Sequence, residues 1–335
     1  MRSCNNLPPV KQLAKQGPDV NGVVCYGDAP MGAEKSVSKL LASQRPLVIG
    51  HRGYCSRAPE NTLESFKLAI DAGADLVELD YHHSRDNCPV VIHDHTLDRT
   101  TDARSKWRRK KIQVASKTAA EILSLDAGRW FGHDHAGAKV PLLSDALDLI
   151  QKDSCALIER KSGDPAACVR LLKEKGLVNH VVVQSFDWKY LRSFHEQEPS
   201  QVLGALGPAS LLPNAKRPVG ISRRLNQRWL DQIHKTGAKI VVWSHRVSKE
   251  SVRQAHQRGL KVWIYTVNDA TLAKRLLDFG VDGIITNDTS LIRAALRHIN
   301  LADILAELAS LTAQERATLM QKLRALDAKD AMEKS

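Results

Sequence analysis

Histidines, basic residues and carboxylates recur at the ends of strand-like segments in the first half of this 335-residue sequence. Imidazoles can accept and donate protons near neutral pH, whereas arginine and lysine stabilise charge on a phosphoryl group. Carboxylates grouped on one face can bind a divalent cation. The residues concerned are His51, Arg52, Glu60, Glu78, Asp80, His93, Glu159 and Lys161. Together they predict chemistry on a phosphate-containing substrate.

Glu78 and Asp80 lie two residues apart in the strand-like run 76–81, so their side chains share one side of the strand. Paired carboxylates at the buried end of a strand are costly unless a cation neutralises them. Glu159, in a later strand, would complete a three-carboxylate set, and Glu60 could reach the same face as an oxygen ligand. All-oxygen ligation favours Ca²⁺ or Mg²⁺ over zinc. The alternative is a half-exposed strand with a polar face.

His51 and His93 each lie near the end of a strand-like run, where they could act as general base and general acid. Arg52 supplies a bidentate clamp for phosphate, and Lys161 would offset the charge of a bound phosphate. Each residue alone has an ordinary structural explanation, such as a hydrogen-bonded core histidine. Their joint position near strand ends favours one shared site.

Residues 47–298 alternate short β-branched runs with amphipathic stretches, which predicts parallel strands joined by helices. About nine strand-like runs in roughly 250 residues predict an α/β fold, a (β/α)8 TIM barrel with one extra strand near 90–94. An open doubly wound sheet is the competitor, but no GxGxxG motif follows the first strand. The carboxyl ends of barrel strands face the active site, and the residues singled out above lie there.

Three further segments flank or interrupt this alternating region. Residues 1–45 have the glycine and proline content of a poorly ordered lead-in. Residues 95–141 break the alternation and are predicted to form an insertion, after the second strand region, within a catalytic domain over 46–298. Residues 299–335 have the apolar periodicity of two helices, which we expect to cover the barrel or to form a homodimer contact.

Several motifs resemble those of the glycerophosphodiester phosphodiesterase family, a group of barrels similar to the phosphatidylinositol-specific phospholipases C. The matching motifs are HRG (51–53), PENT (59–62), GAD (73–75), ELD (78–80), VVIHD (90–94), LDRTT (97–101), IERK (158–161) and GVDGIIT (280–286). The resemblance covers about residues 47–298 and implies a barrel with a small inserted module. It also implies metal-dependent hydrolysis of glycerophosphodiesters, such as glycerophosphocholine or glycerophosphoethanolamine, to sn-glycerol 3-phosphate and an alcohol.

The resemblance further implies roles for individual residues. They are metal ligation by Glu60 or Glu78, Asp80 and Glu159, acid–base work by His51 and His93, and phosphate binding by Arg52 and Lys161. Tyr265 stands where the family often has tryptophan, and Trp263 precedes it by two residues, so both would face the substrate cleft or both away.

Two alternatives to this function stay open. The first is a lysophospholipase D or sphingomyelinase D-like activity, with Trp107, Trp130 and Phe131 of the insertion lining an apolar groove. The second is a catalytically silent sensor of a phosphate-containing ligand, although the full set of polar residues argues against it.

The chain has 49 basic and 37 acidic residues, and its net charge of +12 indicates an anionic partner. Six of the eight residues 104–111 are basic. Such a cluster predicts either a solvated loop or a peripheral contact to a membrane. No stacking platform or helix-turn-helix pattern supports nucleic-acid binding. The six cysteines are scattered, which predicts free thiols. The sequence shows no secretory signal and no long apolar run, so we expect a cytoplasmic location.

Overall fold

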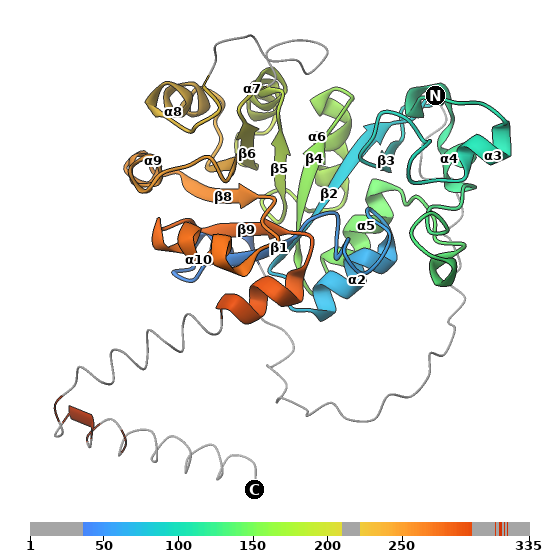
Figure 1. Cartoon of the computed structure of the whole chain (residues 1–335). Coiled ribbons are helices and arrows are strands. Elements are labelled where there is room, and N and C mark those ends of the chain that lie inside the picture. The colour runs from blue at the N-terminus through green and yellow to red at the C-terminus, as the bar shows by residue number, and fades with distance from the viewer. Residues whose placement is uncertain are drawn as a thin grey trace, which may run out of the picture.

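The computed structural model describes residues 36–209 and 222–296, together with five positions between 312 and 320. The strands are β1 (Leu47–Gly50), β2 (Leu76–His83), β3 (Pro89–Val91), β4 (Cys155–Arg160), β5 (Val182–Ser185), β6 (Val202–Gly207), β7 (Ile240–Ser244), β8 (Lys261–Tyr265) and β9 (Gly283–Thr286). Parallel pairing runs in the order β1-β9-β8-β7-β6-β5-β4-β2, and β2 pairs again with β1. This closure, with helices around it, confirms the predicted (β/α)8 barrel (Figure 1).

Helices connect most of the strands and begin at residues that cap them. They are α1 (Val37–Ala42), α2 (Leu63–Asp71), α3 (Ala103–Trp107), α4 (Ala119–Leu123), α5 (Leu143–Ile150), α6 (Pro165–Glu174), α7 (Trp188–Gln197), α8 (Gln227–His234), α9 (Lys249–His256) and α10 (Ala270–Asp278), with 3₁₀ turns η2 (Val114–Ser116) and η3 (His133–His135). Thr62 and Asp164, for example, accept hydrogen bonds from the first turns of α2 and α6.

Alternation along the strands decides which side chains enter the barrel. Leu76 of β2 belongs to the apolar cluster inside the barrel, whereas Val77 and Leu79 pack among the helix-facing residues. Glu78 and Asp80 share the parity of Leu76, so they point inward near the carboxyl end of the strand.

The extra strand is β3, which pairs antiparallel with β2. It ends at Val91, earlier than the expected 90–94, so His93 lies on the loop that follows. The insertion after this loop has its own apolar cluster, which includes Leu97, Ile122 and Leu125. Its helices α3 and α4 lie beside the barrel next to β3 (Figure 1).

Most of the residues at the two ends of the chain are outside the described part. The predicted lead-in over residues 1–35, the predicted C-terminal helices and the expected homodimer contact therefore stay predictions. Within the described part, α1 begins before the barrel, and its Val37 joins the apolar cluster inside it.

The cysteines depart from the expectation in one respect. Cys55 and Cys168 are free thiols. Cys88 is disulfide-bonded, so the expectation that all thiols are free is wrong. In the described residues no helix is long and apolar enough to cross a membrane, and the cytoplasmic location stays a prediction.

Asp75 connects segments at the amino-terminal end of the barrel. Its carboxylate accepts from Arg45 at 2.6 and 3.0 Å and from the Val48 backbone N–H at 2.9 Å, and Arg293 lies 3.2 Å away. Burial opposes ionisation, but these partners keep the pKa of Asp75 below its ordinary value of 3.8. The ionised carboxylate therefore stabilises the folded chain.

We expect Asp75→Asn to lower the free energy of unfolding at neutral pH by about 1–3 kcal/mol, because charged hydrogen bonds are lost. A depressed pKa contributes stability above the unfolded value of ~3.9 and loses it as the pH falls through the lower folded value. The difference between wild type and variant in urea unfolding should therefore shrink below about pH 4. An equal difference at neutral and acidic pH would contradict this role.

Candidate active site

Three buried carboxylates meet near the carboxyl ends of β2 and β4. The register pairs Asp80 with Glu159, and Glu78 lies two residues earlier on β2. Oxygens of all three lie within 4.8 Å of one another, and the residues are 1%, 7% and 1% exposed in that order. Strand register thus brings together three of the carboxylates that the sequence singled out.

Two cations contact this cluster. Lys161 Nζ lies 3.0 Å from Asp80 Oδ1 and also contacts Glu159 Oε1. Arg52 Nε lies 3.3 Å from Asp80 Oδ2. Burial opposes ionisation, but Lys161 and Arg52 hold the pKa of Asp80 below its ordinary range. Burial and the neighbouring carboxylates raise the pKa of Glu78, and burial raises that of Glu159 to about 7.

This donor set fits a divalent cation. Asp80 Oδ1 is buried and accepts no hydrogen bond from the part of the chain that the structure describes, even though Lys161 Nζ is close to it. Carboxylate oxygens are the hard donors that Mg²⁺ and Ca²⁺ prefer. A dication would also relieve the repulsion among the three carboxylates. Glu78, Asp80 and Glu159 are therefore the residues that would hold the metal.

Glu60, which the sequence offered as a metal ligand, lies outside this cluster. Its Oε1 accepts from Arg52 Nη1 at 2.9 Å and from Arg99 Nη2 at 2.8 Å. Its Oε2 accepts from Arg99 Nη1 at 2.8 Å. Both oxygens thus accept hydrogen bonds from guanidinium groups in this structure, and direct metal ligation by Glu60 stays a prediction.

His93 is held by a chain of contacts that leads back to Glu60. Its Nδ1 lies 2.7 Å from Asp94 Oδ1, which makes Nδ1 the donor and leaves Nε2 for proton transfer. Arg99 donates to both Asp94 oxygens, at 2.8 and 2.9 Å, and to both Glu60 oxygens. Sequence reasoning gave no role to Asp94 or Arg99, although both lie in the motifs VVIHD and LDRTT.

His51 is held by a residue from the far end of the barrel sequence. Its Nδ1 lies 2.6 Å from Asn287 Oδ1, and the Asn287 backbone N–H donates to Asn268 Oδ1 at 2.8 Å. Burial, reinforced by the charge of Arg52, lowers the pKa of His51 to about 4. The imidazole is therefore neutral at neutral pH, with Nε2 able to accept a proton.

The turn after β1 places the Arg52 backbone against the carboxylates. Arg52 and Gly53 have left-handed φ values of 51° and 85°. The Arg52 backbone N–H donates to Glu78 Oε2 at 2.9 Å, and its carbonyl accepts from Ser65 Oγ at 2.8 Å. A Cβ at Gly53 would lie 2.5 Å from the Ser65 carbonyl carbon, so only glycine fits this turn.

Two amide side chains support the carboxylates, and sequence reasoning gave neither a role at the site. Asn61 Nδ2 donates to Asp80 Oδ2 at 2.9 Å, and Asn61 Oδ1 accepts from the Asp80 backbone N–H at 3.1 Å. Gln184 Nε2 lies 3.4 Å from Glu78 Oε1, and Gln184 Oε1 is buried without a hydrogen-bond partner in the described residues. Asn61 thus fixes the orientation of one proposed metal ligand.

The two aromatic residues expected at the substrate cleft are separated by their depth in the barrel. Trp263 is 1% exposed within the apolar cluster, and a Cβ at Gly283 would lie 2.7 Å from its ring. Trp263 therefore packs in the core of the barrel, and its contact with the substrate stays a prediction. Tyr265, two residues nearer the strand end, is half-buried, donates to the Gly207 carbonyl at 2.7 Å and packs edge-on against Phe186.

Comparison with known proteins points to one family. The sequence profile of the glycerophosphoryl diester phosphodiesterase family matches residues 51–291. A glycerophosphodiester phosphodiesterase of Caldanaerobacter subterraneus subsp. tengcongensis is 32% identical over 251 residues, covering 73% of this chain and 95% of that protein. One of Bacillus subtilis is 32% identical over 285 residues, covering 79% and 91%.

Solved structures give the same result. A putative glycerophosphoryl diester phosphodiesterase of Silicibacter pomeroyi has a TM-score of 0.66 and 30% identity, covering 77% of this chain and 95% of its own. A phosphodiesterase of Oleispira antarctica, in complex with the product sn-glycerol-3-phosphate, has a TM-score of 0.65 and 27% identity, covering 77% and 99%. The range matched by the family profile contains every residue of the candidate site.

Proposed function

Since this chain belongs to the glycerophosphoryl diester phosphodiesterase family and is a phosphoric diester hydrolase, we propose that it hydrolyses glycerophosphodiesters with a divalent cation as cofactor. Glycerophosphocholine and glycerophosphoethanolamine are the proposed substrates, and sn-glycerol 3-phosphate and the free alcohol are the products. The observation that carries this proposal is the pair of histidines, each held through Nδ1, beside three carboxylates and two cations. The product bound to the Oleispira antarctica relative supports it.

The charged residues have two separate proposed roles, binding of the cation and binding of the phosphate. Glu78, Asp80 and Glu159 would hold the cation, which supplies positive charge that polarises the phosphoryl oxygens. Arg52 and Lys161 contact the same carboxylates and are placed to bind further phosphate oxygens. Positive charge then surrounds the phosphoryl group as negative charge develops on it.

We infer the roles of the two histidines from their hydrogen-bond partners. His51 faces the neutral amide of Asn287, so it stays neutral and takes the proton of the attacking hydroxyl. Burial lowers the pKa of His93 overall, but the carboxylate of Asp94 acts in the opposite direction and favours the imidazolium. His51 has no such carboxylate on its Nδ1, so we assign to His93 the proton given to the leaving alkoxide. The new bond forms between the nucleophile oxygen and phosphorus as the bond to the leaving oxygen breaks. The nucleophile is water or the glycerol 2-hydroxyl. The second route gives a cyclic phosphate, and water then attacks its phosphorus and breaks the bond to the 2-oxygen, which leaves sn-glycerol 3-phosphate.

The test is turnover of glycerophosphocholine and of lysophosphatidylcholine in parallel, with products identified by phosphorus NMR. Release of sn-glycerol 3-phosphate from the deacylated diester supports the proposal. Turnover of the lysolipid alone would shift the function to lysophospholipase D. Absence of turnover with either substrate, in folded protein supplied with Mg²⁺ or Ca²⁺, would contradict the proposed activity. It would favour the catalytically silent sensor of a phosphate-containing ligand.

One observation favours lysophospholipase D as a second candidate. Trp130 of the insertion is 41% exposed and packs edge-on against Phe131, so an apolar surface is available for an acyl chain. Trp107 is less available, because Lys117 Nζ lies 4.0 Å above its ring. Exchange of Trp130 for alanine should then affect the lysolipid and spare glycerophosphocholine.

Arg99 is proposed as a positioning residue that acts through Asp94 and His93. We expect Arg99→Ala to lower kcat by ~10–100-fold, as loss of a supporting residue does elsewhere. Arg99→Lys should restore part of the rate, and the effect should be smaller for an ester whose leaving group needs no proton. Arg85→Ala is the matched control, because Arg85 is 60% exposed and pairs with Glu121 of the insertion. Wild-type kcat in Arg99→Ala would contradict the role.

A further inference from the structure

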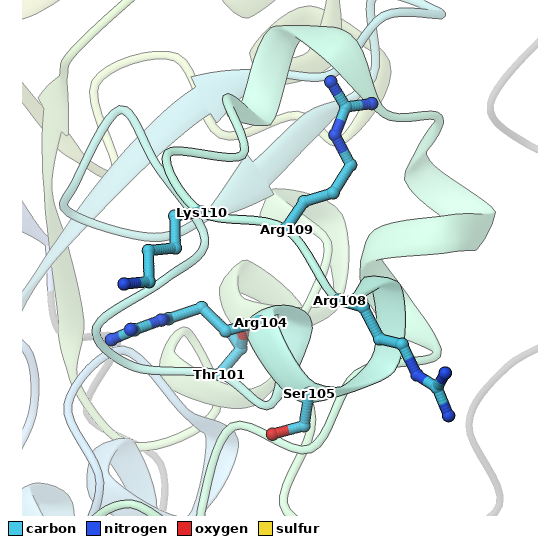
Figure 2. Close-up of a pocket in the computed structure, with 6 residues that line it drawn as sticks. All are labelled: Thr101, Arg104, Ser105, Arg108, Arg109 and Lys110. Carbon is cyan, nitrogen blue, oxygen red and sulfur yellow. The ribbon is translucent and has the colours of Figure 1, made fainter.

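A second polar pocket lies on the insertion. Its volume is about 680 Å³, and it is lined by Thr101, Arg104, Ser105, Arg108, Arg109 and Lys110. Figure 2 shows Arg104 and Lys110 extending toward the same side, whereas Arg108 and Arg109 extend in other directions. The lining combines four exposed cations and two hydroxyls and includes no carboxylate.

The charges of this pocket are not compensated within the described residues. No carboxylate in 36–209 or 222–296 forms an ion pair with the four lining cations. The nearby cations are engaged instead, since Lys106 donates to Ser124 and Lys117 pairs with Glu121. Like charges this close in sequence repel one another, so an anion bound among them would stabilise the arrangement.

A short segment connects the pocket with the active site. Asp98 accepts from the backbone N–H groups of Lys111, at 2.6 Å, and Ile112, at 2.9 Å, which fixes the end of the basic loop. Arg99, the next residue, contacts Glu60 in the site, and Thr101 already lines the pocket. The backbone between these two residues spans at most ~7 Å, so a short segment connects the pocket with a residue that contacts the site.

We propose that this pocket docks the protein on an anionic phospholipid surface, through the phosphate groups of several lipids. Cations that extend in several directions suit separate phosphates on a surface better than one continuous strand. No aromatic ring lines the pocket, so it lacks the platform on which nucleic-acid bases stack. Trp130, exposed on the same insertion, is of the type enriched at membrane interfaces. Docking would hold the active site near headgroup-derived diesters, a consequence that rests on the proposed function.

The test is co-sedimentation of the full chain with phosphatidylcholine vesicles that contain about one-third phosphatidylserine. The pocket variant is Arg104→Gln, Arg108→Gln, Arg109→Gln, Lys110→Gln. The control variant is Lys189→Gln, Arg192→Gln, Lys274→Gln, Arg275→Gln, which removes the same charge from exposed positions of α7 and α10. We expect the pocket variant to bind these vesicles at least ~10-fold more weakly and the control to bind nearly as wild type.

Equal losses of vesicle binding in the two variants would show that only net charge matters, and would overturn the proposal. Undiminished vesicle binding by the pocket variant would also overturn it. Displacement from vesicles by inorganic phosphate at low concentration would assign the pocket to a free phosphate instead. Tighter, pocket-dependent binding to single-stranded RNA would assign it to nucleic acid. Turnover of soluble glycerophosphocholine is measured separately, so its absence alongside intact vesicle binding would count against the proposed function only.

Discussion

Replacing His93 with alanine is expected to lower the rate of glycerophosphocholine hydrolysis by at least ~10²-fold. The same variant should lose far less activity toward a p-nitrophenyl ester of glycerophosphate. The reason is that p-nitrophenolate leaves without a proton, so a missing general acid matters little for this substrate. His51→Ala should lose activity toward both substrates, because the nucleophile needs a base in either case.

This comparison separates the two histidines by the proton that each one moves. His234→Ala is the matched control, because His234 is exposed at the end of α8. Its activity should equal that of wild type with both esters. Near-wild-type hydrolysis of glycerophosphocholine by either His51→Ala or His93→Ala would remove that residue from the mechanism. Rescue of His51→Ala rather than His93→Ala by the activated ester would reverse the assignment of acid and base.

The second large effect is expected from Glu78→Gln, which removes one carboxylate charge and keeps the side-chain shape. We expect the affinity for Mg²⁺ or Ca²⁺ to fall by at least ~10²-fold, since changes outside the ligand set already cost ~10–100-fold. Calorimetric titration of the purified chain measures this directly. Asp80→Asn should behave in the same way, because Asp80 belongs to the same carboxylate cluster and contacts both Arg52 and Lys161.

A thermal readout makes this test independent of turnover. A cation that binds the folded chain raises its Tm by mass action. This rise should disappear in Glu78→Gln and persist in Glu174→Gln, a matched control on the exposed side of α6. Wild-type cation affinity in Glu78→Gln would exclude Glu78 as a ligand.

The features that depend on the alternation of side chains along a strand could be predicted from the sequence. Alternation along β2 places Glu78 and Asp80 on the inner side, and the register with β4 brings Glu159 beside them. The same reasoning was insufficient for Trp263, because parity gives the side of a strand and not the depth in the barrel. Trp263 lies one step below the carboxyl end and is enclosed there, whereas Tyr265 reaches it.

The contacts that orient the side chains of the site come from loops, where residue spacing follows no regular repeat. Glu60 could be read as a free carboxylate because Arg99, its main partner, lies 39 positions away on the insertion side. Asn287 reaches His51 across 236 positions, through closure of the barrel between β9 and β1. Such partners are set by the closed sheet, so the sequence motifs mark these residues without giving their contacts.

The most direct measurement is the release of sn-glycerol 3-phosphate from glycerophosphocholine by the purified chain. The protein is first stripped of metal with EDTA, and Mg²⁺ or Ca²⁺ is then added back. We expect no release without a cation, turnover with one of the two, and loss of that turnover in the His51→Ala, His93→Ala double variant. Release that is unaffected by EDTA, or that persists in the double variant, would contradict a metal-dependent site built on these two histidines.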